Sequence, residues 1–202
     1  MDDDPPFVAD RPLARAALHW AESLHSGQRR AVDEAPFVLH PAEVAMLLSV
    51  RGYDDEVVAA GFLHDSVENT DASVADVEER FGERVARIVA AVTEDPAIGG
   101  YHARKAALRT QVAAADADAH AVYAADKLVK TRELRAQAAR SKAALDEPDL
   151  VRRREHYEES LRMLEHVAPE SSLVQQLGFE LWALRSLPPA SHGPAVGAGR
   201  AS

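Results

Sequence analysis

Apolar residues recur at the spacing of an α-helix along most of this chain. Within residues 10–25 they fall on one helical face, Pro12 stands in the first turn, and Gly27 follows the end. The members of that face are Leu13, Ala17, Trp20, Ala21 and Leu24. The same period predicts further helices over about residues 41–52, 54–65, 73–82, 83–93, 101–114, 118–140, 148–167 and 169–187. Strand-like alternation is essentially absent, so the sequence predicts an all-α fold, a compact bundle of about eight or more helices.

Local signals mark the segments between these helices. Ser73 followed by Asp76 resembles a capping box, although Asp is weaker than Glu at the second position. Residues 26–39 lack a helical period and are expected to form a loop that carries the positive charges of Arg29 and Arg30.

Length and composition divide the chain into one domain and two tails. A chain of 202 residues is most often one domain. We expect a disordered acidic tail over residues 1–9, the main helical domain over residues 10–140, C-terminal helices packing on it over residues 141–187, and a second disordered tail over residues 188–202. Four large aromatic residues are expected in the core: Trp20, Phe62, Phe81 and Trp182.

Charge and cysteine content limit the possible functions. The formal net charge of −10 argues against nucleic-acid binding, because phosphates attract clustered Lys and Arg. No segment approaches the roughly 20 apolar residues of a membrane span, and the acidic N-terminus does not resemble a signal peptide, so a soluble cytoplasmic protein is expected. The chain has no cysteine, so any metal site would use His, Asp and Glu.

Ionisable residues interrupt the apolar helix predicted to end near residue 65. Because a buried charge is costly unless it is paired or bound to a metal, His64 and Asp65 are candidate metal ligands. Glu68 lies one turn further on, where it would hold a water beside an ion. The alternatives are a hydrogen-bonded pair at a helix end and, for Glu68, an ordinary surface charge.

Two residues far away in the sequence complete the candidate ligand set. His40 precedes Pro41, and Asp126 interrupts an apolar helix face. Two imidazoles and two carboxylates suit Mn²⁺, Fe²⁺, Mg²⁺ or Zn²⁺. Taken alone, His40 also fits a structural role before a proline, and Asp126 fits a solvated helix position. The charged neighbours of Asp126 are expected to form an outer face: Lys127, Lys130, Arg132, Glu133 and Arg135.

Seven short segments, in order, resemble the hydrolase domain of the RelA/SpoT alarmone enzymes, especially its small stand-alone members. The segments are HSGQRR (25–30), PFVLHP (36–41), FLHDSVENT (62–70), FG (81–82), VTED (92–95), RK (104–105) and ADKL (125–128). A His-Asp pair alone is a weak signal, but the ordered set, within a match from about Ala14 to Leu134, is specific.

The resemblance implies an HD-type helical bundle with a divalent metal ion, most often manganese. The positions that match the family's ligands are His40, His64, Asp65 and Asp126. The pair after the His-Asp motif handles the attacking water in that family. Here this pair is Glu68 and Asn69, where the family ordinarily has Glu followed by Asp; Glu68 can keep the general-base role, but Asn69 cannot ionise.

The family removes the 3′-pyrophosphate from guanosine tetra- or pentaphosphate, giving GDP or GTP. Positive charge for binding such a substrate would come from Arg29, Arg30, Arg104 and Lys105, with Arg30 the better match to the family's arginine. Two further substrate contacts depart from the family pattern, because Tyr123 stands where Lys is usual and Lys130 where Asn is usual.

The sequence leaves three hypotheses open. The first is this hydrolase, with a small-molecule nucleotide as its partner and neither nucleic acid nor membrane; a homo-oligomer is compatible with the sequence. The second keeps the chemistry but changes the substrate to another nucleotide or phosphate ester, such as NADPH. The third is a degenerate module that binds a nucleotide without turnover, because Asn69 replaces the family's carboxylate.

Overall fold

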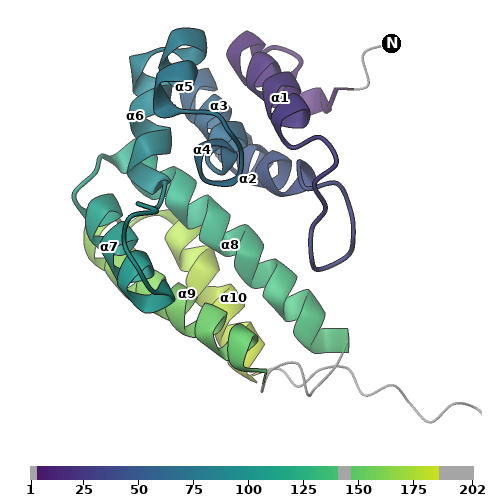
Figure 1. The fold of residues 1–202 in the computed structure, drawn as a ribbon. Coiled ribbons are helices and arrows are strands. Elements are labelled where there is room, and N and C mark those ends of the chain that lie inside the picture. The colour runs from purple at the N-terminus through teal and green to yellow at the C-terminus, as the bar shows by residue number, and fades with distance from the viewer. Residues whose placement is uncertain (1–3, 141–146, 187–202) are drawn as a thin grey trace, which may run out of the picture.

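The computed structural model describes residues 4–140 and 147–186, and its regular structure is helical (Figure 1). A short 3-10 helix, η1, covers Pro6–Val8. The α-helices are α1 (Pro12–Leu24), α2 (Leu39–Ser49), α3 (Asp55–Leu63), α4 (Ser66–Asn69), α5 (Val74–Phe81), α6 (Glu83–Val92), α7 (Tyr101–Ala113), α8 (Ala117–Arg140), α9 (Pro148–Val167) and α10 (Ser172–Ser186). The described residues contain no strand beyond an isolated bridge between Arg29 and Pro36, so the predicted all-α fold is confirmed.

Helix α3 lies at the centre of the N-terminal half. All of its residues from Val57 to Leu63 are buried, and α1, α2 and α6 pack around it. Asp54 fixes its start, because the Asp54 carboxylate accepts a hydrogen bond of 3.1 Å from the Val57 amide. Since the helix ends at Leu63, the polar residues that follow it begin inside the molecule.

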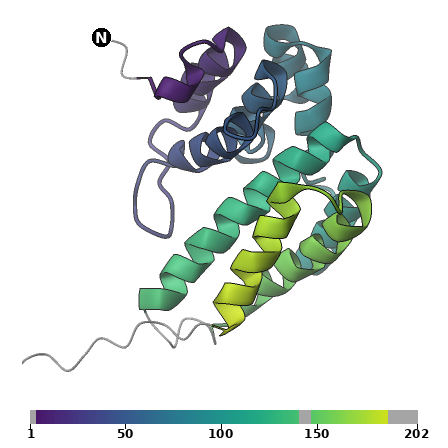
Figure 2. The same cartoon turned by 180° about the vertical axis from the view of Figure 1, so that it is seen from behind.

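Helix α8 lies between the two halves of the bundle. It contacts α2, α3 and α6 on one side and α7, α9 and α10 on the other. Figures 1 and 2 show its long diagonal course between these two groups. Because other helices cover α8 on both sides, several of its polar residues pack against those helices.

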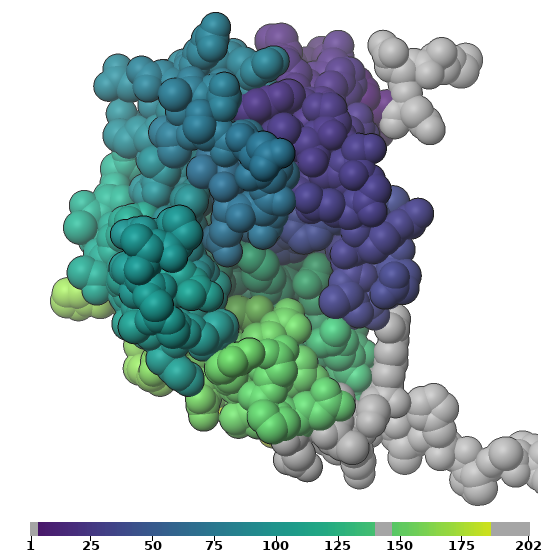
Figure 3. All heavy atoms as spheres, viewed as in Figure 1, coloured from purple at the N-terminus to yellow at the C-terminus, as the bar shows by residue number. Residues whose placement is uncertain are grey.

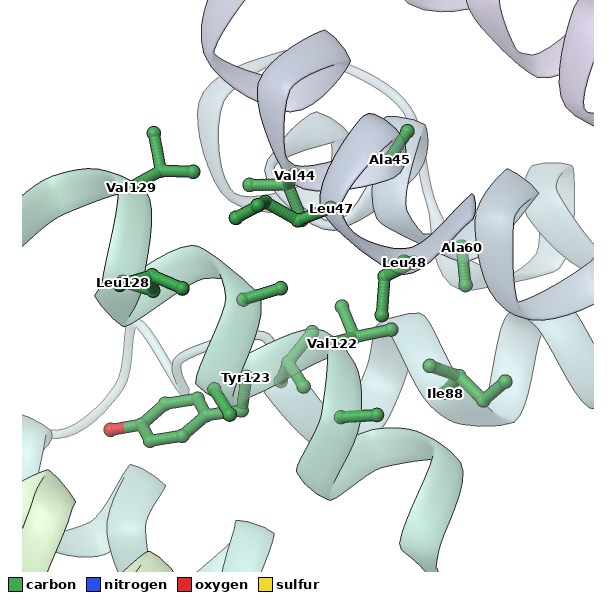
Figure 4. Close-up of a cluster of buried hydrophobic side chains, with 14 of the residues drawn as sticks. Val44, Ala45, Leu47, Leu48, Ala60, Ile88, Val122, Tyr123, Leu128 and Val129 are labelled. Carbon is green, nitrogen blue, oxygen red and sulfur yellow. The ribbon is translucent and has the colours of Figure 1, made fainter. Parts of the chain in front are cut away.

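The apolar core lies where α2, α3, α6 and α8 meet. Figure 4 shows Val44 and Leu48 of α2, Ile88 of α6 and Val122 of α8 gathered there, and all four are completely buried. Burial of one such side chain contributes roughly 1.5–3 kcal/mol. This core therefore fixes the relative positions of α2, α3 and α8. Helices α2 and α8 carry candidate ligands, and α3 ends directly before the other two.

Gly61 permits a close approach between α2 and α3. A Cβ atom at this position would lie 2.7 Å from Leu48 Cδ1 and 3.1 Å from Ala45 Cα. Alanine is the better helix former by roughly 1 kcal/mol, but the clash with the α2 backbone should outweigh this gain. We expect Gly61→Ala to lower the free energy of unfolding by about 1–3 kcal/mol, measured by urea denaturation.

Gly178 in α10 provides the matched control. A Cβ atom there would make an ordinary contact, 3.7 Å from Leu161 Cδ2. Gly178→Ala should therefore raise the free energy of unfolding by about 0.5–1 kcal/mol. A Gly61→Ala protein as stable as Gly178→Ala would contradict the tight contact between α2 and α3.

The periphery differs from the sequence prediction in two places. Within the expected N-terminal tail, residues 6–8 form η1, Val8 is fully buried, and the rings of Phe7 and Phe62 stack with centroids 5.9 Å apart. These apolar contacts order the segment. Trp182, expected in the core, is 51% exposed, because it lies with Phe179 on an outer face of α10.

Parts of the predicted tails fall outside the described residues. These are residues 1–3 and the expected C-terminal tail over residues 188–202, together with residues 141–146 between α8 and α9. Within the described chain, no helix combines the length and apolar character needed to cross a lipid bilayer.

Candidate metal centre

Four buried polar side chains converge where α2, α8 and the end of α3 meet. The Nε2 atom of His40 lies 3.3 Å from His64 Nε2 and 3.2 Å from Asp126 Oδ1. Asp65 Oδ2 lies 3.5 Å from His40 Nε2 and 3.4 Å from His64 Nε2. None of the four residues is more than 5% exposed. The structure therefore brings together all four residues that the sequence predicts as metal ligands.

The local structure explains how these side chains reach one point. His64 and Asp65 lie in the turn that joins α3 to α4. The sequence predicts them within the end of the helix, whereas α3 ends one residue before His64. His40 is the second residue of α2. Asp126 lies within α8, which packs directly against α2. The buried turn after α3 thus faces His40 of α2 and Asp126 of α8.

Opposite charges within the cluster shift its pKa values. Burial alone would lower the pKa of His64, but attraction to Asp65 and hydrogen bonds with Asp126 and Asp65 raise it to about 10. Burial alone would raise the pKa of Asp65, but His64 and Lys130 hold it well below its ordinary range. The pKa of Asp126 is likewise lowered, against its burial, by Lys127 and Lys130. Both carboxylates therefore stay ionised at neutral pH.

A hydrogen bond outside the cluster orients His64, and a carboxylate lies next to the outer nitrogen of His40. His64 Nδ1 lies 2.9 Å from the Gly61 carbonyl, to which it donates, so that Nε2 faces the cluster. His40 Nδ1 lies 3.5 Å from Glu133 Oε1, and both atoms are buried with no hydrogen-bond partner among the described residues. An imidazole whose outer nitrogen faces a carbonyl or a carboxylate is typical of a metal-bound histidine.

The donor set fits a divalent metal ion. Donors on one ion with bonds of about 2.1 Å would lie about 3.0–3.4 Å apart, close to the 3.2–3.5 Å separations between the imidazole nitrogens and the carboxylate oxygens. His40, His64 and Asp65 each place a donor atom within 4.8 Å of the others, and Asp126 joins them through both histidines. Mixed nitrogen and oxygen donors suit Mn²⁺, Fe²⁺, Mg²⁺ and Zn²⁺.

Metal affinity should rise with pH, because a proton on His64 competes with the ion. With its pKa raised to about 10, His64 is protonated at neutral pH and must release about one proton when an ion binds. We expect the dissociation constant for Mn²⁺ to fall about tenfold for each unit of pH between about 6 and 8. Isothermal titration calorimetry in buffers of different ionisation enthalpy measures both quantities; an affinity that is independent of pH would contradict this account.

Glu68 and Asn69 lie on α4, directly after the His64 and Asp65 turn. Both residues are exposed, and Glu68 lines a small surface cavity of about 190 Å³. Burial lowers the pKa of Lys105 to about 8. The negative charges of Glu68 and Asp126 both oppose this change. Glu68 thus follows the His64 and Asp65 turn by one helical turn and remains open to water.

A cavity of about 290 Å³ opens beside His40. The loop before α2 contributes Arg29 and Arg30 to its lining, and α8 and α9 contribute Lys130 and Arg153. The guanidinium of Arg30 is held in place by Asp33 and, at 3.0 Å, by Glu43. The predicted positive loop therefore lies next to the ligand cluster.

A second cavity of about 240 Å³ lies between α7, α8 and α9. Its lining consists of Tyr101, Lys105, Lys127, Lys130, Asp149, Arg153, His156 and Tyr157. Lys130 and Arg153 line both cavities, so the two are neighbours. Figure 3 shows the corresponding hollow between α7, α9 and the first 70 residues, with α8 at its floor.

The sequence did not indicate the residues that α9 adds to these cavities. Arg153, His156 and Tyr157 follow the last segment of the family resemblance, Ala125 to Leu128, by some distance in the chain. They form part of the polar positions of an amphipathic helix, a pattern that is equally typical of a solvated face. Only the packing of α9 beside α7 and α8 turns them toward the ligand cluster.

Arg104 and Lys105 do not form one positive patch. Both bind the buried carboxylate of Glu94, Arg104 through Nε at 2.5 Å and Lys105 through Nζ. Arg104 lines the small cavity beside Glu68, whereas Lys105 lines the second cavity. Lys105 is therefore the one of the two that faces the same space as Lys127 and Lys130.

Tyr123, a predicted substrate contact, lies in the core. It is 1% exposed, its hydroxyl lies 2.9 Å from Ser160 Oγ, and it lines neither of the two cavities (Figure 4). Lys127 Nζ lies 4.4 Å from the centroid of the Tyr123 ring. Tyr123 therefore contacts Lys127, which lines the second cavity, but does not itself line either of the two cavities.

The expected outer face around Asp126 is also corrected. Lys127 is 3% exposed and donates to Asp126 Oδ2 at 2.6 Å, and Lys130 donates to Asp126 Oδ1 at 2.9 Å. Glu133 approaches His40. Arg132 and Arg135 pair with the buried Glu180 of α10 at 3.1 and 2.9 Å. Lys127 and Glu133 therefore face other helices, whereas Arg135 remains exposed, as the predicted outer face requires.

Comparisons with solved structures support the same architecture. A structure described as a metazoan ortholog of SpoT that hydrolyses ppGpp aligns with a TM-score of 0.71 and 29% identity, covering 87% of this chain and 97% of that one. A protein from Listeria monocytogenes aligns with a TM-score of 0.66 and 26% identity, covering 74% and 97%.

Two sequence relatives illustrate how much of the chain is matched. The guanosine-3′,5′-bis(diphosphate) 3′-pyrophosphohydrolase of Drosophila melanogaster is 36% identical over 132 residues, which cover 63% of this chain and 73% of that protein. The enzyme of the same name from Aquifex aeolicus is 42% identical over 78 residues, 39% of this chain. The matched part is only 11% of the Aquifex protein, so the chain spans about a tenth of that longer relative.

A family model described as HD domain matches residues 17–150, which include all four residues of the cluster. The match covers well over half of the chain. Together with the helical bundle and the His-Asp cluster, it establishes that the chain belongs to the HD domain family.

Proposed function

We propose that this protein is a cytoplasmic, divalent-metal-dependent phosphohydrolase that removes the 3′-pyrophosphate from guanosine tetra- or pentaphosphate, leaving GDP or GTP. The observation that carries the proposal is the buried cluster of His40, His64, Asp65 and Asp126 beside two cation-lined cavities. The Drosophila and Xenopus tropicalis relatives, matched over 73% and 72% of their lengths, bear the name of this activity.

The four residues of the cluster would hold the ion, for which Mn²⁺ is the first candidate and Fe²⁺, Mg²⁺ or Zn²⁺ the alternatives. When bound, such an ion acidifies a water molecule and offsets phosphate charge. Two ionised carboxylates, Asp65 and Asp126, would offset the charge of a dication, and they also pair with Lys127 and Lys130.

Glu68 is the residue best placed to accept a proton from the attacking water, because it is exposed and lies one turn after Asp65. As the water oxygen bonds to the phosphorus next to the 3′-oxygen, the bond from that phosphorus to the 3′-oxygen breaks. The 3′-oxygen takes up a proton, and pyrophosphate leaves. Asn69 can hydrogen bond to the water or the substrate, but it cannot share the role of base.

The neighbouring cations would hold the substrate. Arg29 and Arg30 face the cavity beside His40, where a guanidinium can stack on a base or pair with a phosphate. Lys130 and Arg153 lie between the two cavities, where they can contact phosphates from either side. Fixed cations in a partly buried site stabilise charge that develops on phosphate oxygens.

A second candidate function keeps the reaction but changes the substrate. The observation that favours it is Lys130, a charged residue only 2.9 Å from Asp126 Oδ1 at the mouth of the cluster, where the family resemblance leads one to expect Asn. A different phosphate ester, such as NADPH, would then fit the site better.

A phosphate-release screen with Mn²⁺, in which inorganic pyrophosphatase converts any pyrophosphate to phosphate, separates these functions. Guanosine 3′,5′-bis(diphosphate) should yield GDP and pyrophosphate with a kcat/KM at least about tenfold higher than the phosphate release from NADPH or guanosine 3′-monophosphate. Faster release from NADPH would overturn the proposed substrate. Absence of all turnover, with hydrolysis restored by Asn69→Asp, would identify a module that has lost catalysis.

A further inference from the structure

His156 is a buried polar residue in the second cavity to which neither the sequence nor the proposed reaction assigns a role. It lies on α9, lines the cavity and is 4% exposed. Its Nδ1 atom lies 2.9 Å from Arg109 Nη1, whereas its Nε2 atom is buried with no hydrogen-bond partner among the described residues. A buried polar atom without a partner is costly, and an unpartnered nitrogen on a residue that lines a cavity points to a ligand there.

The contact with Arg109 determines which nitrogen of His156 carries the hydrogen. A guanidinium can only donate, so Nδ1 must accept, and the neutral ring carries its hydrogen on Nε2. Arg109 is itself held by Glu159 at 2.6 Å. Burial, together with the charges of Lys127, Lys105 and Arg109, lowers the pKa of His156 to about 2, although Asp126 opposes the change. At neutral pH the residue is therefore an uncharged donor with a fixed direction.

The groups that share the cavity with His156 favour an anion. Lys105, Lys127, Lys130 and Arg153 line it, and Asp149 is the one carboxylate among its described lining residues. Glu94 pairs with Lys105, and Asp126 pairs with Lys127 and Lys130, so the three carboxylates balance part of this charge and leave an excess of one cation. A ligand surrounded by cations and N–H donors must supply several acceptor oxygens. A phosphate group does so in every direction, whereas a base or a sugar does not.

The cavity adjoins the ligand cluster, so one substrate can reach both. Lys127 and Lys130 contact the two oxygens of Asp126 while they line the cavity. A diphosphate chain whose first phosphate lay at the cluster would place its second phosphate in the direction of these two lysines. The two adjacent phosphates of a diphosphate would thus occupy the ligand cluster and the second cavity.

We propose that His156 is a binding residue of a second phosphate subsite, in which its Nε2–H donates to the terminal phosphate of the substrate's 3′-diphosphate. The assignment of that phosphate rests on the proposed function, but the subsite itself rests on the cavity. The role of His156 is to favour diphosphate esters over monophosphate esters, which cannot reach the subsite.

Nuclear magnetic resonance of the ¹⁵N-histidine-labelled protein with Mg²⁺ tests the subsite directly. The ring signals of His156 are identified by their absence in His156→Gln. We expect a hydrogen on Nε2, a bare Nδ1 between about pH 5 and 8, and a saturable shift when inorganic phosphate is added. His166, which is exposed on the same helix, should not shift. An imidazole that titrates in this range, or that phosphate leaves unchanged, would overturn the proposal.

Variants provide the second measurement, in which inorganic phosphate binding is followed by calorimetry. His156→Leu removes the donor and should weaken binding about ten- to hundredfold, as expected for a hydrogen bond to a charged group. His156→Gln retains an N–H group near the position of Nε2 and should recover much of the affinity. His166→Leu is the matched control and should bind as the wild type does. Equal affinity in all four proteins would contradict the subsite.

The outcomes separate this inference from the proposed function. A protein that hydrolyses guanosine tetraphosphate while phosphate leaves His156 unchanged would keep the function and lose the subsite. A protein in which phosphate shifts His156 but no guanosine tetraphosphate is hydrolysed would keep the subsite and lose the function.

Discussion

Asp65→Ala should abolish both metal binding and hydrolysis. The Asp65 carboxylate lies 3.5 Å from His40 Nε2 and 3.4 Å from His64 Nε2, and it is one of two buried anions available to balance a dication. Loss of a contact that merely orients a ligand already costs 10- to 100-fold in affinity, so loss of the ligand itself should cost more than about 100-fold. Calorimetric titration with Mn²⁺ and a turnover assay measure the two effects.

Asp71→Ala is the control for this experiment, because it removes an exposed carboxylate a few residues further along the chain. It should leave metal affinity and turnover unchanged. Asp65→Ala should also remain folded, which circular dichroism checks, because the apolar core around Val44, Leu48 and Ile88 is untouched. Wild-type metal affinity in a folded Asp65→Ala protein would exclude Asp65 from the ligand set.

Glu68→Gln should retain the metal and lose catalysis. Glutamine has nearly the same shape as glutamate but cannot accept a proton from water at neutral pH. A positioned general base contributes typically 10²- to 10⁴-fold to the rate, so kcat should fall by about that factor. Metal content should be unchanged, because Glu68 is exposed on α4 and lies outside the cluster of His40, His64 and Asp65.

Glu79→Gln makes the same chemical change at an exposed position of α5 and should have no effect on kcat. The comparison isolates the role of Glu68 from a general effect of removing negative charge. If Glu68→Gln kept kcat within a few-fold of the wild type, another group would have to act as the base.

Much of the fold could be predicted from the sequence, because each helix is marked by the spacing of its own apolar residues. The apolar period placed each α-helix from α1 to α10 apart from the four-residue α4, and the Ser73 and Asp76 capping box at the start of α5 is confirmed. The ligand cluster could also be predicted, because a charge within an apolar helix is costly and therefore informative. His64, Asp65 and Asp126 each stand out against apolar neighbours.

The surroundings of the cluster could not be read in the same way, because they depend on how helices pack. A charged residue on a helix has the same local pattern whether it faces water or another helix. Lys127 therefore reads as surface charge, although α8 is covered on both sides and buries it against Asp126. His156 and Arg153 reach the site only because α9 folds back beside α8.

The measurement that tests the central claim most directly is the metal content of the purified protein, determined by elemental analysis together with hydrolysis of guanosine tetraphosphate in added Mn²⁺. We predict one divalent ion per chain, bound through His40, His64, Asp65 and Asp126, and release of GDP and pyrophosphate in equal amounts. A protein that binds no divalent ion at neutral pH, or that hydrolyses guanosine tetraphosphate equally well after complete chelation of divalent ions, would contradict the account.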